Sequence, residues 1–320
     1  PRQAYSCHMP SGELKLRAAL EEPPQSLEGL LHCEQRWAVA SAGVRIPVTI
    51  AHRRGIAIDK SAPLLVMCYG AYGACLDTDF RPEWAALMLR GWVVAFAHVR
   101  GGGELGPRWH AAGRLLSKPA SARDLRCAVE SLHEWGYSQP ERTAAAADSA
   151  GGLALGGLLN AAPELLGAAL LRSAFLDPYT PMVDAALPLT AEDYEEWGDP
   201  ATDEAVMQCM LAYSPYHNLS DRPYPPTLYC VGQNDRRVPC TQSLRFIARL
   251  RHRTAQRELS AMPQLIHVRE NGGHMPDGGR YRRLEQLALE YAFLTKAVGL
   301  ENTTGHPLRA KRTRSRISAR

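Results

Sequence analysis

Short apolar runs alternate with longer segments of helical periodicity through most of the chain. Runs of strand length occur at residues 64–69, 92–98, 168–171, 227–231 and 265–268. Helical patterns occur at residues 82–90, 120–135, 150–160 and 281–298, and a weaker strand precedes residue 149. Parallel strands need a covering crossover between them. The alternation therefore predicts an α/β fold, with a mostly parallel central sheet and helices on both faces.

The two ends of the chain depart from this rhythm. Residues 1–32 are turn-rich and polar, so we expect an N-terminal lead-in. Two alternating runs then bracket Ser41-Ala42-Gly43, which predicts an antiparallel hairpin at the edge of the sheet. Residues 299–320 have no apolar period and carry many arginines. We therefore predict one α/β domain over residues 33–298, followed by a basic, disordered tail.

Composition excludes several classes of protein. Apolar residues make up 45% of the chain and charged residues 22%, which is ordinary for a globular protein. The longest apolar stretch is interrupted by Asn160, Pro163 and Glu164, so no transmembrane segment is expected. The net charge of +4 arises largely in the basic tail, and a short solvated run of this kind does not predict a nucleic-acid partner.

The distribution of the cysteines indicates a reducing compartment. Eight are scattered without CxxC or CxxH spacing, and several lie inside apolar runs. This pattern predicts reduced core thiols, no zinc site and a cytosolic location. The start of the chain, Pro1-Arg2-Gln3, shows no signal-peptide pattern.

The segment Ala147-Asp148-Ser149-Ala150-Gly151-Gly152 lies between a predicted strand and a predicted helix. It is similar to the G-x-S-x-G nucleophile elbow, in which a sharp turn projects a serine hydroxyl into a cleft. Ala147 stands where the elbow has its first glycine. Taken alone, the segment is more typical of a serine that caps a helix N-terminus.

Two later residues favour the nucleophile. Asp235 and His274 each follow a predicted strand, and α/β sheets place their sites at the carboxyl ends of strands. The order Ser, Asp, His is that of the α/β-hydrolase triad. A serine hydroxyl needs an imidazole to take its proton, and the imidazole needs a carboxylate on its other nitrogen. The backbone N–H of Ala150 is the first candidate donor to the oxyanion.

Further motifs lie in order around these residues. They are Tyr69-Gly70-Ala71-Tyr72-Gly73, His98 to Gly106 with Trp109-His110, the Ser149 elbow, Tyr213-Ser214-Pro215, Asp235 to Pro239, and His274. Together they resemble the prolyl oligopeptidase family of serine hydrolases (peptidase family S9) over about residues 60–298. The likeness is greatest to its prolyl endopeptidase-like branch. The resemblance implies an α/β-hydrolase fold, a catalytic triad and no cofactor or metal.

The resemblance also assigns supporting residues. Tyr69 would donate its hydroxyl to the oxyanion, although a buried strand-end tyrosine is the alternative. Arg237 matches an arginine that contacts a substrate carbonyl, although a loop salt bridge is the alternative. Tyr72 is a further candidate for substrate binding.

Substrate preference follows from departures within the family. Cys209 stands where true prolyl oligopeptidases have a tryptophan that packs on proline, so proline selectivity is not expected. The segment around Asp193 and Glu195 is similar to that of oligopeptidase B, where two carboxylates clamp a basic side chain. A solvated acidic helix start is the alternative.

The family implies two functions. The first is a serine peptidase or esterase that acts through an acyl-enzyme on oligopeptides, with a preference for basic residues, or on small esters and thioesters. The second is a weakly active or inactive interaction module with partners in membrane trafficking near the Golgi. The family's N-terminal β-propeller has no counterpart here, beyond a remnant of its final strand within residues 1–32. We therefore expect the propeller in a longer form of the protein.

Overall fold

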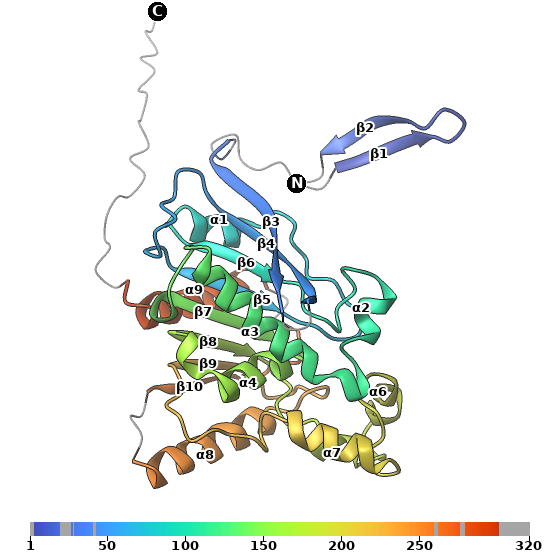
Figure 1. Ribbon diagram of the computed structural model, residues 1–320, viewed down its shortest axis with the longest axis vertical. Coiled ribbons are helices and arrows are strands. Elements are labelled where there is room, and N and C mark those ends of the chain that lie inside the picture. The colour runs from blue at the N-terminus through green and yellow to red at the C-terminus, as the bar shows by residue number, and fades with distance from the viewer. Residues whose placement is uncertain are drawn as a thin grey trace, which may run out of the picture.

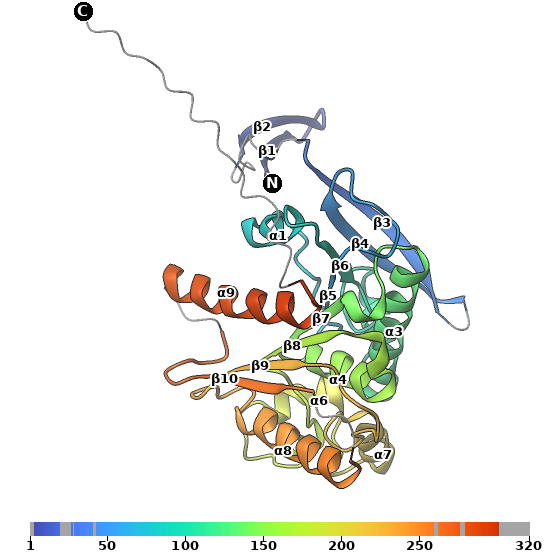
Figure 2. The ribbon, with the colours of Figure 1, turned by 90° about the vertical axis from the view of Figure 1, so that its left-hand side faces the viewer.

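The computed structural model describes residues 3–19, 27, 29–40, 43–258, 262–275 and 279–300. The predicted basic tail lies outside them from residue 301 onward. Residues 3–19 form a hairpin of β1 (Gln3–His8) and β2 (Glu13–Ala19), which is a separate two-stranded sheet. This hairpin stands apart from the central sheet in two perpendicular views (Figure 1, Figure 2). The predicted domain boundaries remain predictions.

The remaining strands form one eight-stranded sheet of order β10-β9-β8-β7-β5-β6-β4-β3. Its strands are β3 (Leu31–Val39), β4 (Arg45–Arg53), β5 (Leu64–Cys68), β6 (Val93–Ala97), β7 (Thr143–Asp148), β8 (Ala168–Arg172), β9 (Thr227–Gly232) and β10 (Gln264–Arg269). Strands β5 to β10 run parallel, whereas β3 and β4 are antiparallel, as the hairpin signal predicted. The predicted mostly parallel sheet is confirmed.

Helices cover both faces of this sheet, as predicted. One face packs against α3 (Pro119–Glu134), α4 (Gly151–Ala161) and α8 (Thr241–Gln256). The other packs against α1 (Pro82–Met88) and α9 (Arg280–Ala297). Figure 2 shows α9 on the opposite side of the sheet from α3 and α8. Alternate residues of the central strands face the two cores, because successive side chains of a strand point to opposite sides.

Helix α8 was missed in the sequence. Its buried side chains include Ser243, Phe246, Ile247 and Leu250, which recur at helical spacing. Four arginines lie among the residues of its other face and dilute the apolar signal.

The segment between β8 and β9, which looked irregular in sequence, holds three helices. They are α5 (Tyr179–Met182), α6 (Thr190–Trp197) and α7 (Glu204–Tyr213). Short helical pieces complete the chain at α2 (Pro107–Ala111), η3 (Leu115–Ser117), η4 (Pro140–Arg142) and η5 (Pro163–Leu165). A third cluster of buried side chains joins α6 and α7 to the loops that follow β5 and β7. Helices α6 and α7 thus pack against the loops at the carboxyl-terminal edge of the sheet.

Arg172, at the end of β8, joins the sheet to its last helix. Its guanidinium lies 2.8 Å from a carboxylate oxygen of Glu290 on α9 and 3.1 Å from Asp148 at the end of β7. Glu290 is 2% exposed, so its charge needs this partner. The ion pairs hold α9 against the strand that carries the candidate nucleophile.

Candidate active site

Ser149 sits in the turn between β7 and α4. Its backbone φ is 51°, in the left-handed region that a residue with a side chain rarely adopts. The turn is held from both sides: the Ser149 N–H donates to the carbonyl of Arg172 at 2.9 Å, and the Ser149 carbonyl accepts from the N–H of Phe175 at 2.8 Å. The structure thus forms the sharp strand-to-helix turn that the motif predicted.

Small neighbours make this turn possible. A Cβ on Gly152 would lie 2.8 Å from the Cβ of Ala174 and 2.9 Å from the backbone of Phe175. A Cβ on Gly151 would lie 3.0 Å from the carbonyl oxygen of Cys68 and 3.4 Å from the Cβ of Ala147. Ala147 is fully buried, and its methyl group fits because Gly151 opposite has none. The alanine in place of the first glycine therefore leaves the elbow intact.

Replacing Ala147 by Gly should accordingly change little. Added backbone freedom should lower the free energy of unfolding by about 0.5–1 kcal/mol. Hydrolysis of an activated ester should change by less than about twofold. Denaturant unfolding and steady-state kinetics measure the two effects. A rate increase of tenfold or more would show instead that Ala147 distorts the elbow.

The three residues predicted to form a triad lie in one hydrogen-bonded chain. His274 Nε2 lies 3.0 Å from Ser149 Oγ, and His274 Nδ1 lies 2.7 Å from Asp235 Oδ2. Both distances are within hydrogen-bonding range. Asp235 is 6% exposed. With a buried carboxylate on Nδ1, the imidazole presents Nε2 as an acceptor to the serine hydroxyl.

The loops after β9 and β10 bring Asp235 and His274 together. A Cβ on Gly232, at the end of β9, would lie 2.3 Å from the carbonyl oxygen of Gly273, so the close approach of the two loops requires glycine there. The Asn234 N–H donates to the carbonyl of Gly272 at 2.9 Å. The position of His274 relative to Asp235 is thus built into the backbone.

Asp235 is held ionised. Its burial by itself would raise its pKa, but hydrogen bonds from His274 and from the backbone N–H groups of Val238 and Arg237 keep the pKa below its usual value. Both backbone groups donate to Oδ1 at 2.9 Å, which leaves Oδ2 for the imidazole.

Tyr69 and Ala150 are the two oxyanion donors that the sequence analysis predicted. Tyr69 follows β5, and Ala150 follows the serine. Within the described ranges, neither the Tyr69 hydroxyl nor the Ala150 N–H makes a hydrogen bond. Burial raises the pKa of Tyr69, so its hydroxyl keeps its proton at neutral pH. Both groups are therefore available to an oxyanion.

The loop that carries Tyr69 rests on a buried lysine. Lys118 Nζ donates to the carbonyl of Gly70 at 2.6 Å, and burial lowers its pKa to about 8. Gly70 has φ of 71°, and a Cβ there would lie 2.4 Å from Val99. The glycine loop that starts at Arg100 packs beneath: a Cβ on Gly101 would lie 2.2 Å from the Gly70 oxygen. The two loops therefore pack with their backbones in close contact.

Glu196 is a second supporting residue that the sequence analysis missed. It is 4% exposed and accepts from the Tyr72 N–H at 3.0 Å. That oxygen, Oε1, also lies 3.8 Å from Lys118 Nζ, and Oε2 lies 2.6 Å from His110 Nε2. The motifs Tyr69 to Gly73 and Trp109-His110 were the sequence signals for this network. The partner of His110 on α6 could not be read from the sequence.

The structure does not bring Asp193 and Glu195 together as a clamp. They lie two positions apart on α6 and so leave the helix about 200° apart, because a turn takes 3.6 residues. Asp193 accepts from the Tyr72 hydroxyl at 3.0 Å, whereas Glu195 is exposed. The sequence analysis gave a solvated acidic helix start as the alternative to a clamp, and the segment is helical. Asp193 and Glu196 share the face that meets Tyr72.

Arg237 and Cys209 complete the predicted set. The Arg237 guanidinium is exposed and close enough to act on the pKa values of both Tyr69 and Asp193, so it faces the same space. Burial nevertheless raises the pKa of Asp193. Cys209, on α7, offers no aromatic ring for a proline; its thiol lies 3.5 Å from the carbonyl of Leu116.

The sheet and its helices define a protein of the α/β-hydrolase fold, with a serine, a histidine and an aspartate in hydrogen-bonded sequence at its carboxyl edge. Comparison with known proteins gives the family. Residues 78–301 match the model of the prolyl oligopeptidase family. The chain belongs to this family of serine-type peptidases.

Several relatives cover nearly all of the chain. It is 36% identical to a prolyl endopeptidase-like protein of Pongo abelii, over 95% of the chain and 42% of that protein. It is 33% identical to dipeptidyl aminopeptidase BI of Pseudoxanthomonas mexicana, over 94% of the chain and 41% of that protein. Oligopeptidase B from Leishmania major superposes with a TM-score of 0.86 at 28% identity, over 92% of the chain and 40% of that structure. The chain thus spans about two fifths of these relatives.

Within its described part, no helix has the length and apolar character to cross a bilayer.

Proposed function

We propose that this protein is a serine hydrolase in which Ser149 is the nucleophile, His274 the general base and Asp235 the residue that orients and stabilises the imidazolium. The single observation that carries the proposal is the continuous chain of hydrogen-bonding distances, 3.0 Å from Ser149 Oγ to His274 Nε2 and 2.7 Å from His274 Nδ1 to Asp235 Oδ2. The expected absence of a cofactor fits this chemistry, which needs none.

The reaction follows from these positions. His274 Nε2 takes the proton of Ser149 as Oγ attacks the substrate carbonyl carbon. The oxyanion of the tetrahedral intermediate accepts hydrogen bonds from the Ala150 N–H and the Tyr69 hydroxyl. His274 then gives its proton to the leaving amine or alkoxide, and the acyl group stays on Ser149. Water, deprotonated by His274, releases the acid and restores the serine.

We infer that short peptides and activated esters or thioesters are the substrates. The named relatives include a dipeptidyl aminopeptidase and an oligopeptidase, which act on peptides by name. Arg237 is exposed beside the site and suits a substrate carbonyl. Asp193 supplies one carboxylate for a basic side chain, and Cys209 gives no support for proline.

Two isosteric changes on α6 test this preference. Asp193→Asn should lower kcat/KM for Arg and Lys substrates relative to Ala by about tenfold, because it removes the charge facing the site. The matched control Glu195→Gln should change the ratio by less than about twofold, because Glu195 is exposed on another side of the helix. In the parent protein, acidification should weaken the preference for basic substrates, because protonation removes the charge of Asp193. The pKa of Asp193 is raised, so this loss should begin at a higher pH than it would for an ordinary aspartate. Equal effects of the two changes would contradict the assignment.

A fluorophosphonate probe tests the proposed function directly. The folded protein should form one covalent adduct, and mass spectrometry of its peptides should locate it on Ser149. Heat-unfolded protein is the control and should stay unlabelled, since the serine is activated only by the assembled site. A folded protein without an adduct would instead favour the interaction module, whose partners would lie in membrane trafficking.

A further inference from the structure

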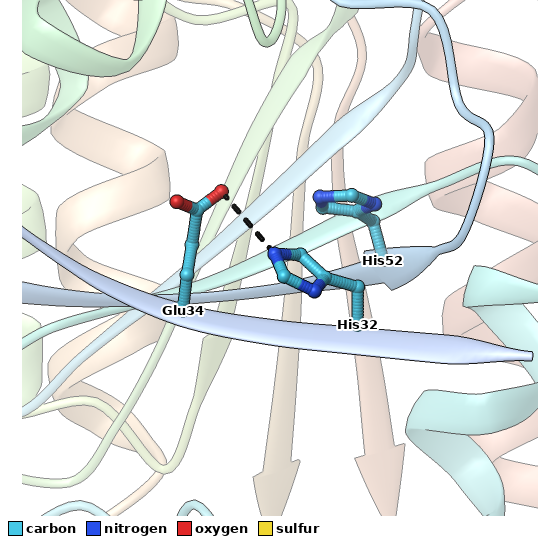
Figure 3. A group of neighbouring side chains, drawn as sticks. All are labelled: His32, Glu34 and His52. Atoms are coloured by element: carbon cyan, nitrogen blue, oxygen red, sulfur yellow. Dashed lines mark ion pairs between the residues drawn. The ribbon is translucent and has the colours of Figure 1, made fainter. Parts of the chain in front are cut away.

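Three side chains of the types that can bind metal ions meet on the edge hairpin of the sheet. His32 on β3 and His52 on β4 are direct partners in the antiparallel register, and Glu34 follows two positions after His32. Opposite residues of paired strands, and alternate residues of one strand, share a face. Figure 3 shows the three side chains rising from the same side of the two strands. One ligand atom of each lies within 4.8 Å of the other two.

The Nε2 atom of His52 is a buried acceptor without a hydrogen-bond partner among the described residues. Its Nδ1 lies 2.9 Å from the carbonyl oxygen of Arg53. A carbonyl can only accept, so Nδ1 carries the proton and Nε2 carries the lone pair. The side chain is 6% exposed, and in the described part of the chain Nε2 is buried with no hydrogen-bond partner. A buried acceptor without a partner is destabilising, and a metal ion would satisfy it.

A hydrogen bond from Tyr137 orients the carboxylate of Glu34. Tyr137, which is buried, donates its hydroxyl to Glu34 Oε1 at 2.5 Å, and His32 Nε2 lies 3.8 Å from the same oxygen. Such outer contacts hold ligands in place at metal centres. The side chains of His32 and Glu34 are 38% and 35% exposed, so the group is open to solvent on one side.

We propose that His32, Glu34 and His52 form a site for a divalent transition-metal ion, of which Zn²⁺ fits best. Two imidazoles and a carboxylate are zinc ligands, whereas Mg²⁺ and Ca²⁺ prefer oxygen alone. In a tetrahedral zinc site the ligand atoms lie about 3.3 Å apart. The widest pair must therefore close by at most about 1.5 Å. Rotation of the partly exposed His32 and Glu34 side chains toward the fixed His52 supplies this movement, and solvent takes the fourth position.

The site is separate from the hydrolase chemistry. Ala51, beside His52, pairs with Val94 near the start of β6, so the site lies at the amino-terminal end of the parallel strands. Ser149 lies at their carboxyl ends. The sequence analysis expected no zinc site because it searched for cysteine spacings, and this group depends on the register of two strands. The guanidinium of Arg36 stacks on Trp135 at 4.2 Å. Its positive charge opposes cation binding, so measurable zinc affinity requires that all three ligands bind the ion.

Competition with a chromophoric zinc chelator measures the site in the metal-free protein. The parent should bind one Zn²⁺ through these residues and unfold at a higher temperature when Zn²⁺ is added. His32→Gln and Glu34→Gln should each weaken binding at least about tenfold, and Tyr137→Phe by a smaller factor. Two matched controls should bind like the parent: His252→Gln, at an exposed histidine of α8, and Cys33→Ser, between the ligands but on the opposite face of β3.

Three results would overturn the proposal. They are a parent protein that binds no zinc, an affinity that His32→Gln and Glu34→Gln leave unchanged, and loss of binding in Cys33→Ser. With Co²⁺ as a second probe, an intense thiolate charge-transfer band would assign the metal to cysteines instead. Labelling by a fluorophosphonate should be the same in all these variants, so this test and that of the hydrolase fail independently.

Discussion

Replacing Asp235 by Asn is expected to lower kcat about 10⁴-fold without unfolding the protein, the size of effect known for this change in a serine triad. The Asn carbonyl oxygen can keep the two hydrogen bonds that Oδ1 accepts from the backbone of Arg237 and Val238. Its NH₂ group would then face His274 Nδ1, where the carboxylate oxygen lies at 2.7 Å. A donor there forces the proton onto Nε2, and an imidazole protonated at Nε2 cannot take the serine proton.

Steady-state ester hydrolysis and circular dichroism check this result together. Asp148→Asn is the matched control: it neutralises a neighbouring carboxylate whose partner is Arg172, and it should change kcat less than about threefold. If Asp235→Asn kept kcat within tenfold of the parent, Asp235 would not be the residue that orients His274.

Replacing Tyr69 by Phe is expected to lower kcat by about 10² to 10³, with little change in KM. Removal of one oxyanion donor has this effect because the donor acts on charge that develops only in the transition state. The Tyr69 hydroxyl makes no hydrogen bond to the described part of the protein, so its loss should not reduce stability through a broken contact. The loop itself stays supported, since Lys118 binds the carbonyl of Gly70.

Tyr72→Phe provides the matched control for this change. The Tyr72 hydroxyl is already engaged by Asp193 at 3.0 Å and by the indole N–H of Trp197 at 3.1 Å. Its removal should alter KM for peptides and leave kcat for a small ester within about threefold. Comparable losses of kcat in both variants would contradict the assignment of Tyr69, because they would indicate a general disturbance of the loop.

Local pattern was sufficient for most of the architecture. Apolar runs and helical periodicity located the strands and the main covering helices, because residue spacing determines which side chains share a face. The same reasoning placed Ser149, Asp235 and His274 after strand ends. Helix α8 escaped because its arginine-rich face masks the apolar stripe of Phe246, Ile247 and Leu250. The helices of the β8–β9 segment escaped because they pack mainly on loops around the site.

What the sequence determined by itself was the order of elements, the identity of the three triad candidates and the family that their motifs resemble. Only the tertiary structure decided which side chains meet. It separated Asp193 from Glu195 by the turn of a helix, paired Glu196 with Tyr72 and His110, and brought His32 opposite His52. The physical reason is that such contacts join residues far apart in the chain. They depend on strand register, helix rotation and the close approach of backbones at positions such as Gly232, which no local pattern encodes.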